Sequence, residues 1–325
     1  MQGDFFLTQW AFLGMRWLYE SLTNESIILT IIIATLIIRC LTVFGDIRSR
    51  KSSMKMQGIQ PQLDKLRKKY EKDPQRLNTE QQKLMRENGV SMFGGCLPML
   101  ITLPLFFIFI AAFRQWGNEM MVKLILALED NTDKGVEMFK SFKFLWVNNL
   151  WMPDNGLKPV IQTASEFFSS SNSKLPNLLY FKENPEALQR FVDLGFFVDN
   201  GGGSYSIAAV TDELTARYEA LVQPCADLYA GYNNGWFIFP LLAGGTTYLS
   251  TWIMQRQQPQ TNAAGNTGKI MQWLMPAMTF VFCLTYNACF AVYWTFSNIF
   301  SLGTTMLINR SIAKRNLPAE EVKQK

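Results

Sequence analysis

Residues 27–44 read IILTIIIATLIIRCLTVF, an almost unbroken apolar stretch that contains one charged side chain, Arg39. As a helix rising about 1.5 Å per residue, the stretch would be roughly 27 Å long, enough to cross the hydrocarbon core of a bilayer. A guanidinium at that depth costs at least ~2.5–3.5 kcal/mol unless it finds water, a partner or the interface. We therefore predict a transmembrane helix in which Arg39 either reaches the interface or serves a function.

The composition narrows the class of protein and excludes several kinds of chemistry. The 325-residue chain contains 25 Phe and 9 Trp, and its long apolar segments predict an integral membrane protein with sizeable aqueous parts. It contains no histidine, which excludes Ser-His and Cys-His nucleophile pairs and His-ligated zinc or haem. Its five cysteines form no CxxC motif. We expect no metal, no cofactor and no enzymatic activity.

Apolar windows predict further membrane spans. Asn287 and Ala288 separate the last two windows, which together are too long for one span and therefore predict a tight hairpin. With 27–44, the chain then has five predicted transmembrane helices. The four additional segments are 97–113, 236–254, 271–286 and 289–308.

Charge distribution orients the predicted spans. Residues 45–96 carry twelve Lys or Arg against six Asp or Glu, whereas residues 114–235 carry ten against fifteen. The tail 309–325 is again basic. By the positive-inside rule, the N-terminus lies outside, and 45–96 and the C-terminus lie in the cytoplasm.

Two aqueous regions are expected on the outer side. Residues 1–26 lack the features of a cleaved signal peptide and predict an amphipathic helix in the membrane interface, anchored by Trp10 and Trp17. Residues 116–235 predict an extracytoplasmic loop or lid, with helices at about 184–197 and 211–229 and a glycine turn at 201–203.

The cytoplasmic segment 45–96 predicts a basic helical hairpin. Ile59, Leu63, Leu66 and Tyr70 form an apolar seam at helical spacing, and Asp73 precedes a proline as an N-cap should. Its basic surface either is a solvated face that enforces topology or attracts polyanions such as anionic lipid headgroups or ribosomal RNA. The basic residues are Arg48, Arg50, Lys51, Lys65, Arg67, Lys68 and Lys69.

Inside the five predicted spans there is no Asp, Glu or Lys, which argues against a proton or sodium relay. Ser297 and Ser301 have no base beside them, so hydrogen bonding or packing between helices is their expected role. If the neutral polar side chains converge on Arg39, they form a hydrated groove open to the cytoplasm; otherwise Arg39 snorkels to the interface. These side chains are Thr35, Thr42, Thr102, Thr246, Thr247, Ser250, Thr295 and Asn298.

Six segments together resemble the YidC-type membrane protein insertases, a family that includes the mitochondrial oxidase-assembly and chloroplast albino insertases. The segments are IIRCLTVF, KSSMKMQGIQPQLDKLRKKY, GVSMFGGCLPMLITLPLFFIF, FLWVNNLWMPD, FPLLAGGTTYLSTWIM and VYWTFSNIFSL. The resemblance is to the short bacterial form, without a large domain before the first conserved span. Residues 157–232 show no motif of the family and are expected to be an atypical insertion.

The resemblance implies an all-α integral membrane protein with five transmembrane helices around a cytoplasm-open hydrophilic groove. Arg39 matches the family's groove arginine, and Tyr293, Trp294, Ser297 and Asn298 match its last span. Thr102 and Ser250 stand where the family often has glutamine.

The implied function is to receive nascent membrane proteins in the bacterial plasma membrane and release them laterally into the bilayer. The implied partners are the Sec translocon, the ribosome or signal-recognition machinery, and anionic lipids. The alternatives are a lipid scramblase or small-molecule transporter that uses the same groove, and an assembly partner of the Sec machinery with an inert groove.

Overall fold

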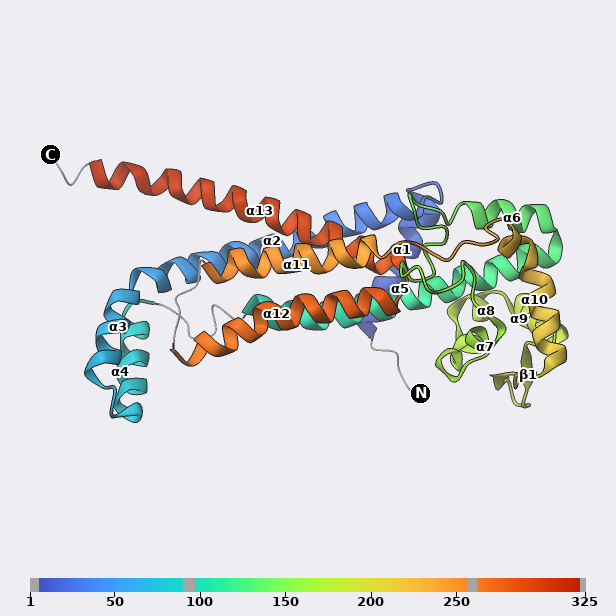
Figure 1. The fold of residues 1–325 in the computed structure, drawn as a ribbon, viewed down its shortest axis with the longest axis horizontal. Coiled ribbons are helices and arrows are strands. Elements are labelled where there is room, and N and C mark those ends of the chain that lie inside the picture. The colour runs from blue at the N-terminus through green and yellow to red at the C-terminus, as the bar shows by residue number, and fades with distance from the viewer. Residues whose placement is uncertain (1–5, 90–96, 257–261, 322–325) are drawn as a thin grey trace. The chain divides into compact units, whose positions relative to one another are not determined.

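The computed structural model describes residues 6–89, 97–256 and 262–321, and the chain is mostly helical (Figure 1). It divides into two compact units. Unit 1 comprises Met1–Ile31, Ile108–Leu241 and Val281–Val292, and unit 2 comprises Ile32–Phe107, Leu242–Phe280 and Tyr293–Lys325.

Five long helices cover nearly all residues of the predicted spans, and each contributes residues to both units. The break between the last two of them, at 286–287, confirms the predicted hairpin, and most of the helices continue well beyond the apolar windows. The five are α2 (Ile27–Gly58), α5 (Leu97–Asp130), α11 (Ile238–Arg256), α12 (Asn262–Thr285) and α13 (Ala288–Glu321).

Among the described residues, one helical stretch, Ile27–Gly45, is long and apolar enough to cross a membrane by length and composition, with a mean hydropathy of 2.6. Gln272–Thr285 is a shorter apolar helix. The other three spans stay predictions from the sequence.

The N-terminal helix α1 (Phe6–Ser21) forms as predicted, but its apolar residues divide between two faces. Phe12 and Leu18 are buried within unit 1, whereas Trp10 and Trp17 are exposed. The helix therefore packs one apolar face against the protein and presents another, with Trp10 and Trp17, at the surface; its place in the membrane interface stays a prediction.

Buried charges fasten α1 to α5. The carboxylate of Glu119 on α5 is 1% exposed and pairs with Lys123 at 2.8 Å and with Arg16 of α1 at 3.4 Å. Arg16 also pairs with Glu183 at 2.7 Å. Burial lowers the pKa of Arg16, but the neighbouring carboxylates, Glu119 first, outweigh it and raise the pKa overall. These ion pairs offset part of the cost of burying the Glu119 carboxylate.

The segment 132–227 of unit 1 folds around aromatic side chains. Phe167 stacks on Tyr218 at 5.1 Å between ring centroids, and Phe196 packs edge-on to Phe168 at 5.3 Å. The remaining elements of the segment are α6 (Thr132–Lys140), α7 (Ala164–Phe167), the 3₁₀ turns Ser170–Asn172 and Leu175–Asn177, α8 (Leu179–Glu183), α9 (Pro185–Asp193) and α10 (Asp212–Asp227).

The expected glycine turn lies inside a small antiparallel hairpin. Strands β1 (Phe197–Asp199) and β2 (Tyr205–Ile207) pair with Phe197 opposite Ile207. Gly201, Gly202 and Gly203 between them all have positive φ, which glycine adopts without steric cost. The helix predicted at 184–197 therefore ends at Asp193, and the fold is not strictly all-α.

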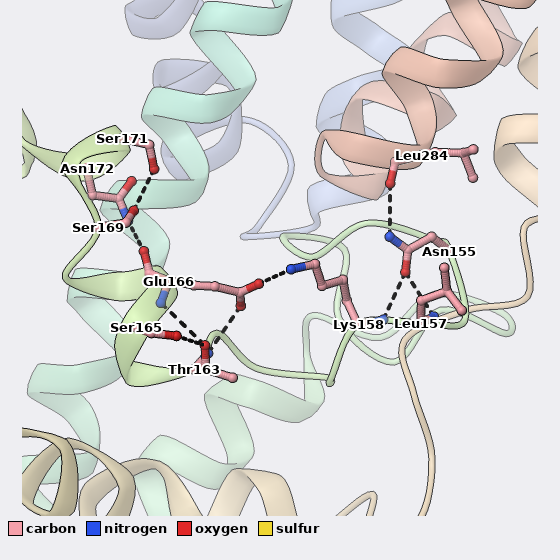
Figure 2. Close-up of polar contacts among 10 residues, drawn as sticks. All are labelled: Asn155, Leu157, Lys158, Thr163, Ser165, Glu166, Ser169, Ser171, Asn172 and Leu284. Carbon is pink, nitrogen blue, oxygen red and sulfur yellow. Dashed lines mark hydrogen bonds and ion pairs between the residues drawn. The ribbon is translucent and has the colours of Figure 1, made fainter. Parts of the chain in front are cut away.

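Loop residues 155–172 are held by local polar contacts (Figure 2). Asn155 accepts hydrogen bonds from the amides of Leu157 and Lys158, both at 3.0 Å. Lys158 pairs with Glu166, whose side chain and that of Thr163 form a capping box at the start of α7.

In unit 2, the predicted hairpin is present as α3 (Gln60–Lys69) and α4 (Pro74–Glu87), which lie side by side (Figure 1). Ile59, Leu63 and Met85 form its buried core. The Asp73 carboxylate accepts the amide of Arg76 at 3.0 Å, as expected of the N-cap.

Candidate functional site

Arg39, on α2 in unit 2, binds Ser297 of α13. Its Nε and Nη2 donate to the same hydroxyl oxygen, at 3.1 and 2.6 Å. Ser297 is 5% exposed, so the guanidinium contacts a buried hydroxyl group. A cation in an apolar helix thus contacts a neutral hydroxyl group, which satisfies part of its hydrogen-bonding capacity without cancelling its charge.

Two threonines lie near Arg39 on the same helix. Thr42 donates to the backbone carbonyl of Arg39 at 3.3 Å, so its hydroxyl is directed back into α2. Thr35, one helical turn before Arg39, is fully buried. The structure therefore places both residues beside Arg39, with Thr42 bonded to the backbone.

A second polar cluster joins α11 and α13. Thr247 Oγ1 accepts Trp294 Nε1 at 2.9 Å and Asn298 Nδ2 at 2.8 Å, and donates to the Ala243 carbonyl at 2.7 Å. Asn298 Nδ2 also contacts the Thr246 hydroxyl at 3.1 Å. The sequence analysis predicted that these residues line a common groove. In the structure they form hydrogen bonds with one another across the two helices.

Trp294 also packs edge-on against Phe106 of α5, with 4.8 Å between ring centroids. Both aromatic rings are buried, as are Thr295 and Asn298. The predicted groove residues on α13 therefore lie mostly inside unit 2.

Ser250, one turn beyond Thr247 on α11, differs in its hydrogen bonding from the residues of this second polar cluster. Its hydroxyl oxygen is buried and has no hydrogen-bond partner among the described residues. A buried hydroxyl left unmatched is unfavourable, so this position suits a water molecule or a polar group of a ligand. Thr102 lies in α5, but its side chain falls outside the described residues.

The basic residues of the hairpin divide into two groups. Arg48, Lys65, Lys68 and Lys69 are exposed, whereas Arg67 pairs with Asp64 at 3.1 Å. The side chains of Arg50 and Lys51 lie outside the described residues.

A shallow cavity of about 310 Å³ lies between α3 and α4. Its lining combines aliphatic side chains with three lysines and two glutamates. The residues are Gln62, Lys65, Leu66, Lys69, Glu80, Lys83, Leu84 and Glu87.

Within the described residues, no group of three or more Cys, Asp or Glu side chains is placed to hold a metal ion. The expectation that Ser297 hydrogen-bonds or packs between helices agrees with its contact to Arg39, but the sequence did not identify Arg39 as the partner.

The sequence model of the family described as "60Kd inner membrane protein" matches residues 17–197 and 205–315. The chain therefore belongs to this family and is a mostly helical bacterial inner membrane protein. The match includes most of 157–232, the segment in which no family motif is recognisable.

Relatives named membrane protein insertase YidC are similar to parts of the chain. The protein from Clostridium perfringens is 32% identical over 144 residues, which cover 44% of this chain and 52% of the relative. That from Clostridium tetani is 34% identical over 146 residues, 45% of this chain and 57% of the relative. The Pelodictyon phaeoclathratiforme protein is 23% identical over 93% of this chain but 36% of its own length. The chain thus spans about half or less of these relatives.

Proposed function

We propose that the chain is a membrane protein insertase, which receives nascent membrane proteins and releases them laterally into the bilayer. The observation that carries the proposal is Arg39, held by a neutral hydroxyl in an apolar helix. Ser297 is an uncharged partner, so this contact does not itself cancel the charge of the guanidinium, which would attract an acidic substrate segment. Family membership and the names of the relatives support the same function.

The proposed arrangement has five membrane-spanning helices, α2, α5, α11, α12 and α13, with the N-terminus outside and the C-terminus in the cytoplasm. The exposed face of α1, with Trp10 and Trp17, would lie in the outer interface. A cytoplasm-open groove would be lined by Arg39, Thr35, Thr42, Thr102, Ser250, Trp294, Thr295 and Asn298. The unmatched hydroxyl of Ser250 supports hydration on this face of α11.

The proposed step breaks no covalent bond and consumes no nucleotide. Arg39 would attract a polar segment of the substrate into the groove, which shortens the distance that this segment crosses through the low-dielectric bilayer. Burial of the substrate's own apolar span in lipid then drives its release. The basic hairpin would contact polyanions, either the ribosome or signal-recognition machinery or anionic lipids. Cooperation with the Sec translocon belongs to the same proposal.

Reconstitution in liposomes tests the function. Purified wild-type protein is expected to insert a single-span substrate with an acidic outer tail, and Arg39→Ala should insert it poorly. Arg39→Lys, which keeps the charge, is the matched control and should retain most insertion. Full insertion by Arg39→Ala would show that the charge is not used.

Lipid flipping in the same vesicles separates the proposal from its main rival. Flipping without insertion would replace the insertase by a scramblase. Crosslinks from Ser250 or Trp294 to a stalled nascent chain are expected if the groove receives substrate, and their absence would favour an inert assembly partner.

A further inference from the structure

The carboxylate of Asp154, in unit 1, is fully buried and receives four hydrogen bonds. Oδ1 accepts the amides of Trp236 at 2.6 Å and Phe237 at 3.1 Å. Oδ2 accepts the amide of Phe239 at 2.8 Å and the indole Nε1 of Trp146 at 3.1 Å. A buried carboxylate is otherwise costly, so this complete set of donors marks a built site.

Three of the four donors are backbone amides at the start of α11: Phe239 lies in its first turn, and Trp236 and Phe237 directly precede it. The first amides of a helix have no partner within the helix, and the helix dipole favours a negative charge there. Gly235 and Phe237 both have positive φ, at 78° and 65°, which turns successive amides toward Asp154. Asp154 thus acts as the cap of a helix that begins more than eighty residues later in the chain.

The next residue makes an equivalent contact with α12. Asn155 Nδ2 donates to the Leu284 carbonyl at 2.9 Å, at the last turn of that helix (Figure 2). Asn234 ties the two loops together, since its side chain accepts the Asn149 amide at 2.9 Å and donates to the Asn149 carbonyl at 2.8 Å. Asp154 is therefore part of a rigid support and not of a free loop.

We propose that Asp154 is a positioning residue, which fixes where α11 begins and how the helix is rotated about its own axis. We call this rotation the setting of α11. This helix is continuous from Ile238 to Arg256, so its first turn determines which way its later residues face. Those residues include Thr247, which binds Trp294 and Asn298. The importance of this setting for insertion rests on the proposed function; the setting itself does not.

The substitution Asp154→Asn tests the proposal with little change in size. It removes the charge and places an amide NH₂ where one carboxylate oxygen now faces two N–H donors. Hydrogen exchange of the amides at 236–239 is expected to accelerate by about 10- to 100-fold, the effect of losing charge-assisted hydrogen bonds. Asp199→Asn is the matched control, because Asp199 accepts one amide, that of Gly201, in an exposed turn.

A disulfide between α11 and α13 reports the setting of α11 beyond its first turn. In a cysteine-free background, Thr247→Cys with Asn298→Cys should oxidise readily, since the two side chains are in contact. Adding Asp154→Asn should slow this oxidation several-fold. Unchanged exchange at 236–239, or unchanged oxidation with accelerated exchange, would overturn the proposal.

Gly235→Ala provides an independent variant, in case Asp154→Asn fails to fold. A Cβ at Gly235 would overlap Asp154 Oδ1, so this substitution displaces the carboxylate without altering it. It should accelerate the same amides, and normal exchange there would contradict the proposal. If wild-type protein inserts no substrate, the proposed function fails while the exchange and disulfide results still decide the role of Asp154.

Discussion

Replacing Ser297 by alanine should remove the hydrogen bond that positions the Arg39 guanidinium without removing the charge of Arg39. The Arg39 Nε and Nη2 atoms share one oxygen, at 3.1 and 2.6 Å, so we count them as a single charge-assisted interaction. Hydrogen bonds to charged groups contribute about 1.5–3 kcal/mol, and side-chain bonds between membrane helices up to about 1.7 kcal/mol. A value near 1.5 kcal/mol corresponds to roughly a tenfold change in an equilibrium constant.

The assay is the initial rate of insertion into liposomes, with substrates that carry an acidic or a neutral outer tail. Ser297→Ala should reduce the rate for the acidic tail by up to about tenfold and leave the neutral tail less affected, because only the acidic tail uses the placement of the guanidinium. Ser301→Ala, one turn further along α13, is the control. A wild-type rate for Ser297→Ala, alongside a defect in Arg39→Ala, would refute the idea that this hydroxyl positions the charge.

Three further predictions concern the aqueous parts. Glu119→Gln should destabilise unit 1 by up to about 3 kcal/mol, because Arg16 and Lys123 lose the buried carboxylate that they share and keep only their more exposed partners; chemical denaturation in detergent measures this. Burial raises the pKa of the Cys225 thiol to about 12, so its contribution to stability is complete below the pKa of the unfolded thiol, about 8.5, and is lost as the pH rises toward 12. Alkylation at pH 8.5 should therefore modify Cys225 only after unfolding, and rapid labelling of native protein would contradict its burial. Lys65→Ala with Lys69→Ala should weaken ribosome binding to proteoliposomes and flatten its salt dependence, whereas an unchanged salt dependence would indicate a merely solvated face.

The exposed and buried sides of α1 show what the spacing of apolar residues along a helix does not predict. Trp10 and Trp17 are exposed, whereas Phe12 and Leu18 pack inside unit 1. Apolar spacing indicates that a helix will bury apolar area, but it does not say whether lipid or protein will cover each side. Only the packing of unit 1 around α1 decided that.

The sequence by itself determined the features that depend on near neighbours. The apolar stretch 27–44 forms a helix, the chain breaks at 286–287, and Asp73 caps α4, because each depends on residues within a few positions of one another.

Tertiary structure decided the partners of the polar groups. Arg39 meets Ser297 across 258 positions of sequence, and Asp154 caps a helix that begins in a distant segment. A hydroxyl or a carboxylate can accept from any donor that reaches it, so its sequence neighbours do not identify the donor. The folding of the intervening chain brings one particular donor within 3 Å of its acceptor, so only the tertiary structure decided which polar residues are in contact.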